Sequence, residues 1–399
     1  MGGLTKPESF QAYLPLKFKR KMSASVNNLT LNSNYYYYYL FLADIKIMEI
    51  FDDLELLDLL EDGFPRRVYD RNNYFDEMDN TTFFRRFRLS KPTVLELVGQ
   101  IEEHLEFPDD RNNALSPINQ VLTCLRCYAT GAHLSSVADF MGIAISSASR
   151  TVKKVSEVIA SLRPHYINMP VAEEVVSVAK KFYDIASFPR VLGCVDGTHI
   201  RIQSPGGHDA ELFRNRKGYF SLNCQVIGDA DLRIRDVVAR WPGSSHDQTI
   251  FNHSRIRARF ENIEFPNSLL LGDSGYALKN YLLTPLPDPQ TRAEQLYNEA
   301  HIRTRNSIER LFGVWKRRFP ILAYGCRLKL STILTIIPAT AVLHNKAIDM
   351  KEELPPVEQD WEQLNYLIEM GNIPDIINHA GEINGPVFRN DVVNYFDNL

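Results

Sequence analysis

The sequence is short of long apolar runs, of cysteine and of any marked excess of one charge. Its most apolar early stretch, Tyr35 to Ala43, is about half the ~20 residues that a membrane-spanning helix needs. More than thirty residues precede that stretch and no convincing cleavage site follows it, so a secretion signal is not expected either. The five cysteines are odd in number and scattered over 399 residues, which excludes a disulfide framework and favours a reducing compartment, the nucleus or the cytoplasm.

The composition is otherwise typical of a soluble globular protein. Hydrophobic residues make up 44% and charged residues 24%, which argues against a disordered or fibrous chain. The length suggests about two or three domains. Because 45 basic residues stand against 49 acidic ones, any affinity for nucleic acid must come from local basic patches.

The first 47 residues differ from the rest. They hold a basic cluster, Lys17 to Lys21, and five consecutive tyrosines, Tyr35 to Tyr39. A homopolymer has no amphipathic period on which to fold, so residues 1–47 are expected to be a disordered leader, with an import signal as the alternative role of the basic cluster. Met48 opens an acidic amphipathic pattern, and we expect it to be the true start of the protein.

Residues 48–165 are expected to form a helical domain. Ser90 and Ser116 are each followed by a proline in the first turn of a helical pattern, which is typical of helix starts. Residues 116–160 approximately have the pattern of a helix-turn-helix, with Gly142 at the turn.

The second helix of that motif carries polar and basic side chains suited to DNA. Arg150, Lys153 and Lys154 lie along it, and such side chains contact phosphates and base edges when a helix enters the major groove. The alternative is a three-helix packing unit that only supports the catalytic core or an oligomer.

The hydrophobic period changes after Pro189. Apolar runs bounded by turn residues predict strands at 191–202, 221–228, 234–241 and 268–272, and helical patterns cover 247–254, 293–319 and 331–350. The last 49 residues, 351–399, contain ten acidic and two basic residues and are expected to form a loosely packed acidic tail.

Three carboxylates mark a candidate site. Asp196 lies within a strand that is apolar on both faces, Asp273 ends another strand between glycine and small residues, and Glu309 lies inside a helix. A buried carboxylate is costly unless it is paired or bound to metal. Each acid taken alone is more often a helix cap, a salt-bridge partner or a turn residue, and spacing alone does not decide between these roles and a joint site.

The surroundings of Glu309 are strongly basic. The window 301–330 contains eight basic residues and this single acid. An acid in such a helix suits metal binding beside a phosphate backbone, and Arg305, Arg310 and Lys316 are predicted to contact DNA phosphates.

Two further groups have weaker claims to chemistry. His199 and His246 neighbour acidic residues and are interpreted as hydrogen-bonding or structural residues rather than proton-transfer groups or zinc ligands. Cys124 and Cys127 form a lone CxxC within a predicted helix and are interpreted as core residues rather than as a zinc site.

Four sequence blocks resemble the Harbinger transposase-derived nuclease family, which is related to the PIF/Harbinger-type DDE transposases. They are Gly193-Cys-Val-Asp-Gly-Thr-His-Ile200, Trp241-Pro-Gly-Ser-Ser-His-Asp247, Leu270-Leu-Gly-Asp-Ser274 and Asn306-Ser-Ile-Glu-Arg-Leu-Phe312. Shorter matches are Asn215-Arg-Lys-Gly218, Ser221-Leu-Asn-Cys224 and Leu343-His-Asn345. The blocks run in order from about residue 80 to the end of the chain, and the leader has no counterpart.

The resemblance implies an α/β fold with an RNase H-like mixed sheet flanked by helices in a catalytic domain at 186–350. It implies a catalytic DDE triad of Asp196, Asp273 and Glu309, with Asp247 as a fourth metal ligand. Ligands that are all oxygen select Mg²⁺ or Mn²⁺. Two such ions about 3.5–4 Å apart activate water and stabilise the leaving 3′ oxygen of a phosphodiester, with Asp196 as the hypothesised bridge between them.

The leading interpretation is therefore a metal-dependent DNA nuclease of the nucleus, with the cytoplasm as a second location. The alternative is a catalytically silent DNA-binding or scaffold protein derived from a transposase. The resemblance also implies a Myb/SANT-like DNA-binding partner protein, because no such domain is visible in this chain, and chemistry on two DNA ends favours a homodimer. No membrane association is expected.

Overall fold

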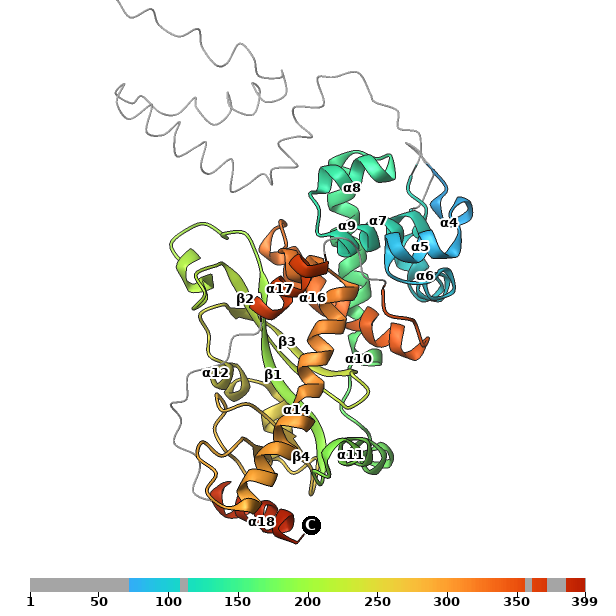
Figure 1. Cartoon of the computed structure of the whole chain (residues 1–399). Helices are drawn as coiled ribbons and strands as arrows, with labels where there is room; N and C mark the ends of the chain where they lie inside the picture. The colour runs from blue at the N-terminus through green and yellow to red at the C-terminus, as the bar shows by residue number, and fades with distance from the viewer. Residues whose placement is uncertain (1–71, 108–113, 356–360, 372–384, 399) are drawn as a thin grey trace, which may run out of the picture.

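The computed structural model describes residues 72–107, 114–355, 361–371 and 385–398. The predicted leader and the predicted start at Met48 lie outside these ranges. Within them the protein combines one mixed sheet with helices on both of its faces and a helical layer from the N-terminal half of the chain (Figure 1).

The sheet has five strands in the order β3-β2-β1-β4-β5. Their bounds are β1 Val191–Arg201, β2 Ser221–Gly228, β3 Ile234–Pro242, β4 Leu269–Leu271 and β5 Leu282–Leu283. β2 runs antiparallel to β1 and β3, whereas β4 is parallel to β1 and to β5. The four predicted strands are confirmed to within two residues at each end, and β5 was not predicted.

β1 is the central strand and is paired on both sides for only part of its length. Its pairing with β4 involves Val191, Gly193 and Cys194. Further along, the backbone N–H of His199 donates instead to the carbonyl of Gly371, at 2.7 Å. Gly371 follows helix α17 (Trp361–Met370), so a segment near the C-terminus covers the strand edge that β4 leaves open.

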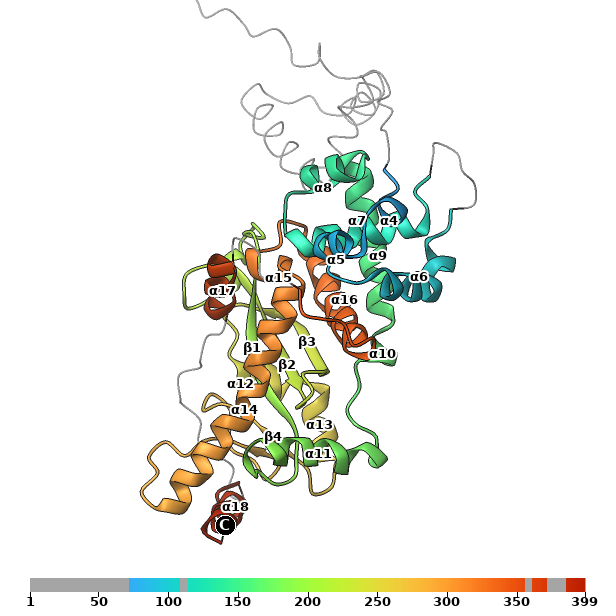
Figure 2. The same cartoon turned by 45° about the vertical axis from the view of Figure 1, so that its right-hand side comes forward.

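Helices lie against both faces of the sheet. Leu311 and Ile308 of α14 (Arg292–Arg318) contact Gly228 on one face, while Asp247, the first residue of α12 (Asp247–Asn252), contacts Gly197 on the other. Figure 2 shows α14 in front of the strands and α12 and α13 (Arg255–Glu261) behind them.

The N-terminal half forms a helical layer. Its helices are α4 Tyr74–Glu77, α5 Asn80–Phe87, α6 Lys91–Leu105, α7 Pro117–Thr130, α8 Leu134–Met141, α9 Ile145–Ser161 and α10 Arg163–Tyr166, whereas α11 Ala172–Ala186 packs on β1 and α14. The predicted helix start at Ser90 is confirmed, because its side chain accepts from the N–H of Thr93. Gly142 follows α8 with a φ of 61°, the left-handed conformation that suits glycine at a tight turn.

The helical layer and the sheet share one continuous apolar core. α9 packs on α16 (Leu330–Asp349), which in turn packs on β3. Tyr128 of α7 meets Phe319, which follows α14, with ring centroids 6.2 Å apart. The remaining elements are the 3₁₀ helix η2 Ala210–Phe213, α15 Ile321–Tyr324 and α18 Gly385–Asp397. The helical layer is thus fixed to the sheet through buried side chains.

The described parts of the C-terminal region are packed, so the expectation of a loosely packed tail is wrong for them. Phe396 of α18 is 4% exposed, and its ring lies 5.6 Å from that of Phe188 and 6.2 Å from that of Tyr297. The acidic composition concealed apolar residues at helical spacing.

Among the described residues, every helix is too short or too polar to cross a bilayer.

Candidate active site

Asp196 lies in the middle of the central strand. Among the eleven residues of β1, only Asp196 and Arg201 are not buried. The backbone N–H of Gly197 donates to Asp196 Oδ1 at 2.9 Å, and Asp196 stands two residues beyond the last residue of β1 that pairs with β4. A single acid is therefore presented at the point where the two parallel strands diverge.

Asp273 reaches the same point through strand register. Leu271 pairs with Cys194 in the parallel ladder, and two residues further along each strand stand Asp273 and Asp196. The N–H of Gly275 donates to Asp273 Oδ1 at 3.0 Å, so a tight turn holds this carboxylate directly after β4. Neighbouring parallel strands thus deliver two acids side by side.

Glu309 comes to the site from α14, one helical turn after Arg305. Arg305 donates from Nη1 to Asp196 Oδ2 at 2.8 Å and from Nη2 to Glu309 Oε1 at 2.6 Å. One guanidinium therefore bridges an acid of the sheet and an acid of the helix. The side chains of Arg305 and Asp196 are 19% and 15% exposed, whereas Glu309 is 46% exposed and marks the open side of the site.

The charges of the three acids influence one another. Burial raises the pKa of Asp196 well above its usual value; Arg305 opposes this rise, and the neighbouring charges of Asp273 and Glu309 add to it. Burial alone would lower the pKa of Arg305, but the charges of Asp196, Glu309 and Asp273 raise it. The structure thus brings Asp196, Asp273 and Glu309 together around one arginine.

Asp247 approaches β1 from the opposite face. Its carboxylate lies against Gly197, whose side of the pleat is opposite to that of Asp196, and its Oδ1 accepts from Asn223 Nδ2 at 2.7 Å. Asp247 is 3% exposed, so this hydrogen bond offsets part of the cost of burying it. The structure does not gather Asp247 on the Arg305 side of β1, and its role as a fourth ligand stays a prediction.

The chemistry of the three acids fits a hard divalent cation. All their donor atoms are carboxylate oxygens. When every acid is ionised, their three negative charges exceed the single positive charge of Arg305. Across the part of the chain that the structure describes, no three His, Cys, Asp or Glu side chains are already grouped as ligands of one ion. At this site Asp196 and Glu309 each hold Arg305 instead.

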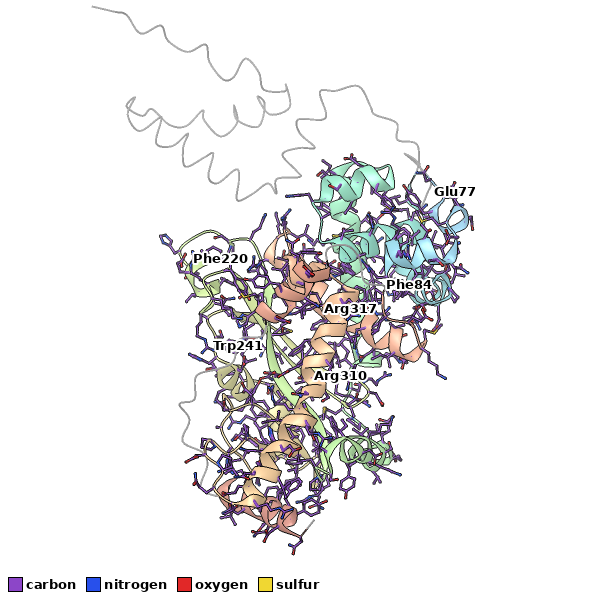
Figure 3. All side chains as sticks on the ribbon, in the orientation of Figure 1. Glu77, Phe84, Phe220, Trp241, Arg310 and Arg317 are labelled. Carbon is purple, nitrogen blue, oxygen red and sulfur yellow. The ribbon has the colours of Figure 1, made fainter. Side chains whose placement is uncertain are left out.

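The predicted phosphate contacts on α14 occupy three different environments. Arg310 is exposed beside Glu309, where Figure 3 labels it. Arg305 is turned inward onto the acids. Lys316 is fully buried and donates to Thr198 Oγ1 at 2.6 Å, so its ammonium is not available to a DNA phosphate, and this prediction is wrong for the conformation described.

The predicted DNA-reading residues lie on α9. Arg150 and Lys153 are exposed, and Lys154 is half-buried. The ammonium of Lys154 lies 4.9 Å from the ring centroid of Phe107, against the end of α6. Two of the three cations are thus presented to solvent on one helix.

The two histidines have structural surroundings. His199 is buried with Nδ1 2.9 Å from Ser221 Oγ; burial lowers its pKa to about 3, and the charges of Lys316, Arg216 and Lys217 act in the same direction. His199 is therefore neutral at physiological pH. His246 precedes α12 at its N-cap position.

Residues that sequence reasoning missed support the acids. Gly197 provides the space for the Asp247 carboxylate, and Asn223 holds it. Asn223 pairs directly with His199 across β1 and β2. The signal was the alternation of the polar residues Ser221, Asn223 and Gln225 with apolar ones in β2, since a buried amide requires polar partners.

Known proteins resemble the region of the chain that contains these residues. Residues 195–345 match the family model described as DDE superfamily endonuclease, and this range contains all four predicted acidic ligands. The protein named "Putative nuclease HARBI1" of Mus musculus is 34% identical over 296 residues, which cover 73% of this chain and 84% of that protein. The protein of the same name from Homo sapiens is 33% identical over 324 residues, which cover 78% and 92%.

A more distant relative comes from a plant. "Protein ALP1-like" of Arabidopsis thaliana is 26% identical over 332 residues, which cover 76% of this chain and 79% of that protein. No solved structure matches the chain significantly.

Proposed function

This chain belongs to the Harbinger transposase-derived nuclease family, and from that premise we propose that it hydrolyses phosphodiester bonds of DNA with divalent metal ions. One observation carries the proposal. The register of two parallel strands and one helical turn bring three acids from distant parts of the sequence around Arg305. Arg305 carries a single positive charge, so three ionised carboxylates around it favour a further cationic ligand.

We propose that the catalytic domain is RNase H-like. The support is the strand order β3-β2-β1-β4-β5, with β2 antiparallel and β4 parallel to the central strand. The acids lie within β1, directly after β4 and on a helix that covers the sheet, which places them at the switch between antiparallel and parallel pairing.

The proposed catalytic residues are Asp196, Asp273 and Glu309, which would hold Mg²⁺ or Mn²⁺. Two such ions, when bound, would supply the charge that activates water and stabilises the leaving 3′ oxygen. Asp196, which interacts with both Asp273 and Glu309, would be the bridging ligand, and Asp247 would be the further ligand. Arg310 is the proposed contact to a phosphate of the DNA backbone, and its exposure one residue after Glu309 supports this role.

We propose that α8 and α9 form a helix-turn-helix that contacts DNA. Its support is the pair of helices joined through Gly142, with Arg150 and Lys153 exposed on the second helix. A DNA substrate implies a nuclear location, with the cytoplasm as the second compartment. A Myb/SANT-like partner protein and a homodimer are part of the same proposal.

The test is cleavage of supercoiled plasmid DNA by the full chain in Mg²⁺ or Mn²⁺. We expect the wild type to cut and Asp196→Asn to lose activity while keeping its fold by circular dichroism. Asp209→Asn is the matched control, because Asp209 is exposed and caps no helix with its side chain. Equal cleavage by Asp196→Asn would overturn the catalytic role of Asp196, whereas no cleavage by the wild type would leave the catalytically silent DNA-binding scaffold as the function.

A further inference from the structure

Arg305 binds carboxylate oxygens of the acids, and these are the atoms that a metal ion would need as ligands. Its two terminal nitrogens each take one oxygen, Oδ2 of Asp196 and Oε1 of Glu309, at 2.8 and 2.6 Å. Charge-assisted hydrogen bonds of this length are among the stronger polar contacts in proteins. Asp196 Oδ2 and Glu309 Oε1 are therefore already occupied by a cation of the protein itself, the Arg305 guanidinium.

The charges at the site indicate what Arg305 compensates. With all three acids ionised, Arg305 neutralises one of three negative charges, because it interacts with Asp196, Glu309 and Asp273 together. A divalent ion would compensate the other two while Arg305 remains close, and a second ion would leave an excess of positive charge around the guanidinium. Metal ions and Arg305 thus compete for the same negative charge.

The position of Arg305 permits it to leave. Its side chain is 19% exposed, and its partner Glu309 is 46% exposed, so the contact on the Glu309 side is the one nearest to solvent. Breaking that contact requires only side-chain rotation, because Arg305 and Glu309 stand one turn apart on the same helix.

We propose that Arg305 is a positioning residue that serves as a placeholder cation: it holds Asp196 and Glu309 in the metal-free protein and releases them when divalent ions bind. This inference rests on the proposed function, because it concerns the metal ligands assigned there. Arg305 prevents the acids from separating under mutual repulsion. Because metal ions must first displace Arg305, the metal affinity of the protein is lower than that of the same carboxylates without the arginine.

The test is isothermal titration of the full chain with Mn²⁺. Arg305→Gln removes the competing charge, so we expect Mn²⁺ affinity to rise about five- to 150-fold, the usual range of coupling between two ligands. The metal-free variant should also melt at a lower temperature than the wild type, because its acids have lost their counter-charge, and Mg²⁺ should remove this difference.

Two variants control the experiment. Arg303→Gln removes an exposed arginine on the same helix whose partner is Glu299, and it should bind Mn²⁺ as the wild type does. Arg305→Lys keeps the charge but not the two-pronged contact, so its affinity should fall between those of the wild type and Arg305→Gln. Arg305→Lys also replaces Arg305→Gln as the test variant if Arg305→Gln does not fold.

The outcomes separate this inference from the proposed function. If Mn²⁺ binds in a manner lost in Asp196→Asn, but Arg305→Gln and Arg305→Lys bind it no more tightly than the wild type, the placeholder role is overturned and the metal site stands. If Mn²⁺ binds neither the wild type nor Arg305→Gln, the proposed function falls as well.

Discussion

At residue 197 the protein has a hydrogen atom where every other amino acid has a carbon, and the carboxylate of Asp247 occupies that space. The neighbouring residue, Asp196, is the first proposed catalytic acid. A glycine is required at position 197 because Asp247 of α12 approaches the strand so closely there. The N–H of Gly197 also donates to Asp196 and so helps to orient it.

Replacing Gly197 with alanine should displace Asp247 and lower the free energy of unfolding by about 1–3 kcal/mol, the usual cost of overpacking. Urea denaturation measures the effect. Gly99→Ala is the matched control, because Gly99 lies in α6 with nothing near its missing side chain, and alanine favours helix there. If the two variants have equal stability, Gly197 is not needed for Asp247.

Lys316 is a second residue whose environment has a measurable result. It is fully buried, and burial lowers its pKa to about 7. Between that value and the ordinary lysine value of about 10.4, the unfolded chain binds a proton that the folded protein does not. Raising the pH through this interval therefore favours the folded state.

We expect the free energy of unfolding of the wild type, relative to Lys316→Met, to rise with pH between about 7 and 10, by at most about 1.4 kcal/mol per pH unit. Denaturant titrations of both proteins over this range give the difference directly, because their other titrating groups are shared. A difference that is constant with pH would show that Lys316 is protonated inside the fold.

Among the elements, α9 carries the proposed contact with DNA. Changing Arg150, Lys153 and Lys154 together to glutamate should weaken DNA binding. Because Arg150 and Lys153 are the exposed pair, the slope of log affinity against log salt should fall by about 0.9 for each of these two phosphate contacts.

Fluorescence anisotropy with labelled duplex DNA at several salt concentrations measures this change. Lys180→Glu with Lys181→Glu provides the control, since both lysines are exposed on α11, away from the proposed reading helix. Unchanged affinity in the α9 variant would mean that these helices serve only as packing support.

Element positions were predicted well wherever a hydrophobic period was long enough to read. The helix predicted at 293–319 is α14, Arg292–Arg318, and the strand predicted at 191–202 is β1, Val191–Arg201. β5 has two residues, too few to show any period, and was missed.

The face of an element was harder to predict than its bounds. α14 contains many basic residues, so its composition alone predicted that Lys316 would lie on the surface. It follows the buried Phe312 by four residues, about one helical turn, and therefore lies on the buried side of the helix. Asp196, Asp273 and Glu309 were identified by resemblance, whereas their meeting depends on the register of β1 and β4, which no single segment encodes.

At the scale of the whole molecule, the C-terminal region stabilises the helix that carries Glu309. Phe396→Ala should cost about 3–5 kcal/mol of unfolding free energy, because the ring is buried against Phe188 and Tyr297. Val387→Ala, at a residue that is 64% exposed, is the control. Thermal or urea unfolding distinguishes this result from a loosely packed tail, in which both substitutions would be silent.

The contact between His199 and Gly371 has a consequence for how the protein is made. A ribosome reaches residue 371 long after it has synthesised the strand that this residue completes, and the exit tunnel delays the meeting further. Until then the nascent chain lacks the partner of this strand margin, three residues from Asp196, so the strand edge beside the candidate site is completed only after translation has passed residue 371.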